Sequence, residues 1–89
     1  MDDEIWTAIV DAIREETDNP NIEIVPDMAS NDVPGWDSLA HVRILLNLDS
    51  RLATMIDMKK TYSAATIADL YVIVKDAHGM TKERPTPIR

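Results

Sequence analysis

A long stretch without helical periodicity, residues 19–36, lies between the two clearest amphipathic segments of the chain. It is interrupted by four residues that disfavour helix: Pro20, Pro26, Pro34 and Gly35. Apolar residues are nevertheless scattered through it: Ile22, Ile24, Val25 and Met28. Long connections in compact domains are usually functional or packed down, so we expect this loop to fold back over a helical core.

Helical periodicity predicts a first helix over residues 3–17 and a second over residues 37–53. The first carries one apolar stripe: Ile5, Trp6, Ile9, Val10 and Ile13. On a wheel of the second, one side collects Leu39, Val42, Leu45, Leu46 and Leu52. Ile44 and Leu48 fall away from that stripe, so we expect both on a partly exposed face that a partner could use.

The remaining chain predicts a connection over residues 56–65 with one short helical turn, followed by a final helix. Thr66 and Asp69 have the spacing of a short capping box, and Gly79 is expected to end the helix. A strand over residues 71–74 is the alternative, but we expect no strand near it in sequence for pairing. The expected fold is an all-α small bundle of three main helices plus a short fourth, with a domain over 1–79 and a flexible tail over 80–89.

Composition and charge exclude several classes of function. The chain has 89 residues, no cysteine and a net charge of -7, which excludes disulfides and thiolate sites and argues against nucleic acid as a partner. The acidic start Met1–Glu4 does not resemble a secretory signal, and no apolar run is long enough for a membrane span. We therefore expect a cytoplasmic protein without membrane contact, and a binding or carrier module in preference to an enzyme.

The charge is unevenly distributed along the chain. Residues 1–37 hold eleven acids and one base, and residues 38–89 hold five acids and eight bases. Because one core is expected, this asymmetry distinguishes ends or faces of one domain, not two domains.

The segment Val33–Leu39 could carry chemistry, because it leads into the second predicted helix. Gly35 permits a sharp turn, Asp37 can cap the helix, and Ser38 falls in its first turn, where its hydroxyl would be exposed. Unpaired N–H groups and the positive end of the helix dipole favour a phosphate at that position. The alternative is that Asp37 and Ser38 only start a helix.

Asp37, Ser38 and Leu39 at the head of an amphipathic helix resemble the 4′-phosphopantetheine attachment site of acyl and peptidyl carrier proteins. Further positions match the same family over roughly residues 3–78: Val42, Leu48, Leu52, Ile56, Thr66 and Ile67. The resemblance implies that a phosphopantetheinyl transferase attaches 4′-phosphopantetheine covalently to Ser38. It also implies that Asp37 supports the transferase's metal, and that the arm carries acyl or aminoacyl intermediates as thioesters.

The resemblance further implies partners: an acyl- or aminoacyl-loading enzyme and a downstream synthase or transferase, served by a monomeric carrier. The candidate docking residues are Leu39, His41, Arg43, Ile44, Leu46 and Leu48. Carriers of fatty acid synthesis typically have acidic residues along this helix. Here the segment from Ser38 to Leu52 has only one acid, Asp49, against two arginines. We therefore expect a specialised pathway, although surface charges without a role would give the same pattern.

Other functions are open at this stage. A small helical adaptor would use the same bundle without a prosthetic group. A serine hydrolase would need His41 or His78 as base, but no oxyanion hole or nucleophile elbow is recognisable. A calcium loop at Asp27–Asp32 would break the required pattern at Ala29 and Asp32. We expect no catalytic residue and no metal site of the chain's own.

Overall fold

The computed structural model describes the backbone of residues 3–83 and the side chains of residues 3–79. Its elements are α1 (Glu4–Glu16), the short 3₁₀ helix η1 (Ser30–Asp32), α2 (Ser38–Leu52), α3 (Met58–Thr61) and α4 (Ile67–Glu83). These residues contain no strand, so the all-α prediction of three main helices plus a short fourth is confirmed, and the strand alternative at 71–74 is wrong. No helix in this part of the chain is long and apolar enough to cross a membrane.

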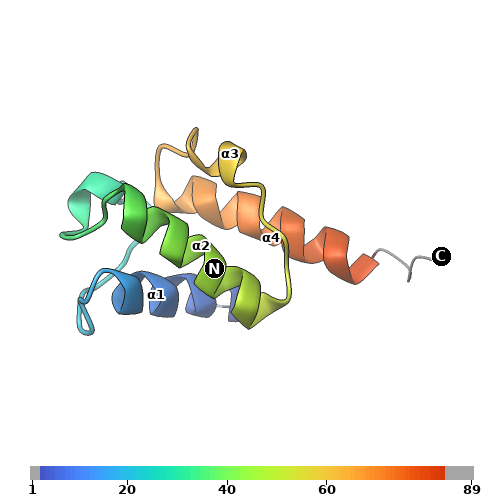
Figure 1. The fold of residues 1–89 in the computed structure, drawn as a ribbon, viewed down its shortest axis with the longest axis horizontal. Helices are drawn as coiled ribbons and strands as arrows, with labels where there is room; N and C mark the ends of the chain where they lie inside the picture. Colours follow the sequence, from blue (N-terminus) through green and yellow to red (C-terminus); the bar gives the residue numbers. More distant parts are fainter. Residues whose placement is uncertain (1–2, 84–89) are drawn as a thin grey trace.

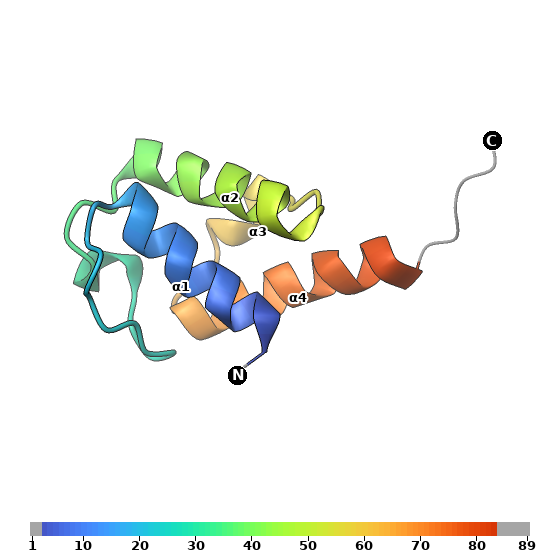
Figure 2. The same cartoon turned by 90° about the horizontal axis from the view of Figure 1, so that it is seen from below.

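The three long helices enclose one core, with α1 and α2 side by side (Figures 1 and 2). α1 and α2 run in opposite directions, since Asn47 of α2 bonds to Glu15 and Glu16 while Arg51 reaches back to Asp11. The first part of α4 packs against α1, and the last part of α4 projects beyond the bundle (Figure 2). The short α3 lies between α2 and α4 (Figure 2).

The loop between α1 and α2 folds back over the core, as expected. Ile24 and Val33 are almost fully buried. The loop also caps α4, because the carbonyl oxygens of Met28 and Pro26 accept hydrogen bonds from Ile67 N–H (2.8 Å) and Ala68 N–H (3.0 Å). Those amides would otherwise be unpaired at a helix N-terminus. The loop thereby fixes the position of α4.

Side chains cap the starts of α1 and α4. Asp3 caps α1 by accepting a hydrogen bond from Trp6 N–H, and its second oxygen accepts one from the Tyr71 hydroxyl (2.6 Å). The Tyr71 bond is the main reason that the pKa of Asp3 lies below its ordinary value. At α4, Thr66 and Asp69 each accept a hydrogen bond from the other's backbone N–H, which is the predicted capping box.

The rotation of α2 about its axis differs from the prediction. Ile44 and Leu48 have no exposed surface, whereas Leu39 and Leu46 are 57% and 59% exposed. The sequence pattern misled because apolar residues lie on both sides of α2, and the side with Ile44 and Leu48 also carries His41. Both ring nitrogens of His41 are hydrogen-bonded, so the imidazole is tolerated next to the core. Ile44 and Leu48 are therefore core residues, and their expected exposure was wrong.

The end of α4 also differs from the prediction. The helix continues through Gly79 to Glu83 and does not end at Gly79. A β-carbon at Gly79 would meet no atom within 4 Å, so no close contact requires a glycine there. A glycine inside a helix costs only about 1 kcal/mol relative to alanine. Of the expected tail over 80–89, the first part is helical in its backbone, and residues 84–89 lie outside the described residues.

The rotation of α2 predicts opposite outcomes for two matched substitutions. Leu48→Ala should lower the free energy of unfolding by about 2–5 kcal/mol, because it leaves a cavity in the core. Leu46→Ala removes the same atoms from an exposed site two residues earlier. It should change the free energy of unfolding by at most about 0.5 kcal/mol. Urea unfolding followed by circular dichroism measures both. Equal losses, or the reverse order, would contradict the observed rotation.

Candidate functional site

The first turn of α2 exposes Ser38 beside backbone donors. Asp37 is the N-cap: its Oδ1 accepts a hydrogen bond from Ala40 N–H (2.8 Å) and its carbonyl oxygen accepts one from His41 N–H (2.9 Å). Within the described residues, the N–H groups of Ser38 and Leu39 have no protein acceptor. Ser38 is exposed, so both its hydroxyl and these two amides are open to an external group.

The turn before Ser38 is held against the end of α1. Gly35 has a φ of +86°, and a β-carbon there would lie 3.1 Å from the carbonyl oxygen of Thr17. Asn19 donates from its side-chain amide to the carbonyl oxygen of Pro34 (2.7 Å) and to the Thr17 hydroxyl (2.8 Å). A larger residue at position 35 would strain the backbone and press on α1, so this turn needs glycine.

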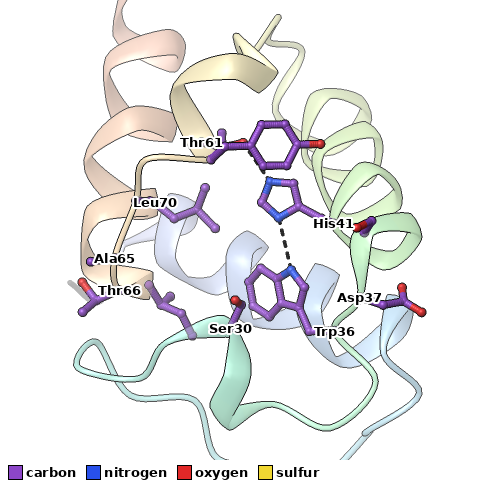
Figure 3. A pocket seen from close by; sticks show the side chains of 12 residues that line it. Ser30, Trp36, Asp37, His41, Thr61, Ala65, Thr66 and Leu70 are labelled. Carbon is purple, nitrogen blue, oxygen red and sulfur yellow. Dashed lines mark hydrogen bonds between the residues drawn. The ribbon is translucent and has the colours of Figure 1, made fainter.

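Ser38 lies on the wall of a cleft of about 290 Å³ formed between the loop, α2, α3 and the start of α4. Figure 3 shows Trp36 and His41 on one side of it, Thr66 and Leu70 on the other, and Thr61 at the top of the view. The lining combines aromatic and aliphatic surface with the hydroxyls of Ser30, Thr61 and Thr66. An extended group attached to Ser38 could therefore make both apolar and polar contacts along the cleft.

His41 is fixed inside this cleft. Its Nδ1 accepts a hydrogen bond from Trp36 Nε1–H (3.1 Å), drawn as a dashed line in Figure 3, and its Nε2 lies 2.8 Å from Thr61 Oγ1. Tyr62 stacks on the imidazole with ring centroids 4.8 Å apart. Burial holds the pKa of His41 below its ordinary value. Since both ring nitrogens point to Trp36 and Thr61, neither is the base that a serine hydrolase would direct at Ser38.

The exposed face of α2 points away from the cleft. We call it the α2 outer face and define it by Leu39, Arg43, Leu46 and Ser50, all of which are exposed. Arg43 makes no ion pair or side-chain hydrogen bond within the described residues.

The other charged residues of α2 are engaged internally. Arg51 forms ion pairs with Asp11 and Glu15 of α1. Asp49 accepts hydrogen bonds from the Thr54 hydroxyl (2.9 Å) and from Ile56 N–H (3.0 Å), which fixes the chain after the helix. Arg43 is thus the charge that α2 offers to a partner.

The structure separates the predicted site residues into three groups. Asp37, Ser38 and His41 lie together at the cleft. Leu39, Arg43 and Leu46 lie on the α2 outer face, and the remaining two candidates, Ile44 and Leu48, are buried and offer no docking surface.

Among the lining residues that sequence analysis missed, three contact His41: Trp36, Thr61 and Tyr62. Trp36 could have been found from its position just before the capped helix start, five residues from His41. Thr61 and Tyr62 gave no local signal, because they reach the cleft only through the packing of α3.

The calcium alternative finds no support at the loop. Asp32 Oδ2 accepts a hydrogen bond from Ala29 N–H (3.0 Å) and so stabilises the η1 turn. Among the described side chains, no group of three or more His, Asp or Glu residues could hold a metal ion together.

Comparison with known proteins gives one informative match. No protein-family model matches the chain, and no curated protein matches it. Among solved structures, the chain resembles the solution structure of holo acyl carrier protein from Geobacter metallireducens, with a TM-score of 0.79 and 19% sequence identity. The likeness covers 96% of this chain and 98% of that one. The chain therefore has the fold of an acyl carrier protein.

Proposed function

We propose that the chain is a discrete carrier protein with 4′-phosphopantetheine attached to Ser38, on which acyl or aminoacyl intermediates are held as thioesters. The observation that carries the proposal is the exposed Ser38 hydroxyl beside two unpaired backbone amides, at the edge of a cleft, in an acyl carrier protein fold. The name of the Geobacter protein says that it is a holo form. That supports, for this chain, a prosthetic group at the matching helix start.

The residues present fit a phosphodiester on Ser38. The free N–H groups of Ser38 and Leu39, with the positive end of the α2 dipole, favour negative charge at that position. Asp37 is exposed beside Ser38 and uses one carboxylate oxygen for the cap, so its other oxygen is available to a transferase's magnesium ion. The terminal thiol of the arm would supply the thioester chemistry, and the chain's own residues would orient and present it.

The α2 outer face supports a dedicated set of enzymes as partners. Its exposed leucines flank Arg43, which has no intramolecular ion pair. A partner that buries this face would need apolar contacts around a carboxylate, because an unpaired arginine is costly to desolvate. This is the reverse of docking an acidic helix on a basic surface, and it favours a specialised pathway over housekeeping fatty acid synthesis.

The adaptor without a prosthetic group remains the second candidate function. The observation that favours it is the same α2 outer face, where Leu39 and Leu46 are more than half exposed. An adaptor would need this face but not the hydroxyl of Ser38, so modification of Ser38 distinguishes the two functions.

Substitution of Ser38 tests the attachment site. Incubation with coenzyme A, magnesium and a broad-specificity phosphopantetheinyl transferase should add one phosphopantetheine to the wild type and none to Ser38→Ala, as measured by intact mass. Because Asp37 rather than Ser38 provides the cap, Ser38→Ala should change the free energy of unfolding by at most about 0.5 kcal/mol.

Ser30→Ala is the matched control, because Ser30 is also exposed and lines the same cleft. It should be modified as fully as the wild type. If Ser38→Ala gains the group, or if the folded wild type gains none while a reference carrier does, the carrier proposal is wrong.

Charge reversal at Arg43 tests the docking chemistry. Arg43→Glu should lower kcat/KM of the enzyme that loads the arm by roughly tenfold, because it places like charges across the interface. Lys75→Glu on α4 makes the same change in net charge at an exposed site away from the α2 outer face and should have little effect. Equal effects of both variants would attribute the loss to net charge and contradict docking through Arg43.

A further inference from the structure

The hydrogen bonds around the cleft converge on His41. It links Trp36, in the turn that precedes Ser38, to Thr61 at the end of α3, and we call these three residues the His41 bridge. Trp36 is half-buried and Thr61 is 2% exposed, so both bonds are partly shielded from water. The exposed ring of Tyr62 stacks on the imidazole from α3.

The donors and acceptors of the bridge assign one protonation state to His41. The Trp36 indole can only donate, so Nδ1 must be the acceptor. The Thr61 hydroxyl donates its one hydrogen to the carbonyl oxygen of Met58 (2.6 Å), so it must accept from Nε2–H. The bridge therefore requires the neutral imidazole with its hydrogen on Nε2.

The bridge connects three segments that meet beside Ser38. Trp36 lies two residues before Ser38, His41 one turn after it, and Thr61 belongs to α3, a helix of four residues. Within the described residues, the hydrogen bond to His41 is the polar side-chain contact by which Trp36 is held. This bond therefore adds a link to α3 to the contacts of Gly35 and Asn19 that hold the turn before Ser38.

We propose that His41 is a positioning residue for the modification of Ser38: its neutral form ties the turn before Ser38 to α3, and protonation breaks this tie. The inference rests on the proposed function, because it assigns His41 a role in presenting Ser38 to a transferase. His41 touches neither the serine nor the reacting phosphate. It acts through Trp36 and Thr61.

Protonation would place two donors opposite each other. The imidazolium carries hydrogens on both nitrogens, so its Nδ1–H would face Trp36 Nε1–H and the hydrogen bond would become a repulsion. Burial already lowers the pKa of His41 in the folded chain, which keeps the neutral form dominant near pH 7. As pH falls below about 6.5, the unfolded chain takes up a proton that the folded chain resists, so stability declines until the folded pKa is reached.

The other ionisable groups near His41 give no alternative explanation for a pH dependence of the His41 bridge. Asp37, one turn earlier on α2, is the one acidic residue of the cleft lining and is engaged in the helix cap. Tyr62 follows α3 and stacks on the imidazole, and Lys59 and Lys60 of α3 are exposed. α4 faces the cleft with Thr66, Ile67 and Leu70, which do not titrate.

Nuclear magnetic resonance on the unmodified protein tests the bridge itself. The indole N–H resonance of Trp36 should shift with the protonation of His41 as pH is lowered from about 8 to about 5.5, with a midpoint below the ordinary histidine pKa. The indole of Trp6, which packs against Tyr71 away from the cleft, is the internal control and should not follow that midpoint. A Trp36 indole that ignores the titration of His41 would overturn the proposal.

Transferase kinetics test the positioning role with a matched pair of variants. Thr61→Val removes the hydroxyl at nearly constant volume, and Thr61→Ser retains it. At about pH 8, Thr61→Val should lower kcat/KM for modification of Ser38 by about fivefold, the equivalent of one neutral hydrogen bond, and Thr61→Ser should not. The ratio of wild type to Thr61→Val should fall towards one as pH approaches about 5.5, because protonation breaks the Trp36–His41 bond in the wild type and so cuts the same tie at its other end.

The outcomes separate this inference from the proposed function. If the wild type, Thr61→Val and Thr61→Ser are modified equally at every pH, the positioning role is wrong and the carrier function stands. A pH-independent loss in Thr61→Val would make Thr61 purely structural and would also overturn the inference. If the folded wild type is not modified at any pH, the carrier function fails, whatever the Trp36 indole shows.

Discussion

The burial of Ile44 and Leu48 fixes the rotation of α2, and the rest of the site depends on that rotation. Both side chains are fully buried in a core that includes Ile9, Ile13 and Val74. Once they point inward, the regular geometry of the helix places Leu39, Arg43 and Leu46 outward and turns His41 towards α3. Turning α2 so that Leu39 and Leu46 became core residues would remove His41 from Thr61 and take Arg43 off the outer face.

A second constraint sets the position of the helix start. Gly35 lies against the end of α1, Asn19 bonds to the carbonyl oxygen of Pro34, and Asp37 caps the first turn. Ser38 is thereby exposed on a rigid element and not on a mobile loop. The cleft beside Ser38 and the α2 outer face belong to the same helix but point in different directions. A carrier could thus hold its arm on one side and its partner on the other.

The helices and their caps could be predicted from the sequence because they depend on neighbours along the chain. Asp37 and the Thr66–Asp69 pair act over three residues, and the predicted first and second helices agree with the structure to within about one residue at each end. The rotation of α2 could not be predicted, because apolar residues lie on both of its sides. The arrangement that forms places His41 beside the core, where it accepts a hydrogen bond from Trp36 and donates one to Thr61. The cleft could not be predicted either, because α3 and α4 come together to line it only when the chain packs.

The most direct test of the account is the covalent state of the protein isolated from its native cells, with no transferase added. Intact mass and fragmentation of the peptide that contains Ser38 would locate any modification. The account predicts one phosphopantetheine on Ser38, released as a pantetheine fragment, and none on Ser30 or Ser50. A protein that is uniformly unmodified in its native cells, or modified at another residue, would contradict the carrier function.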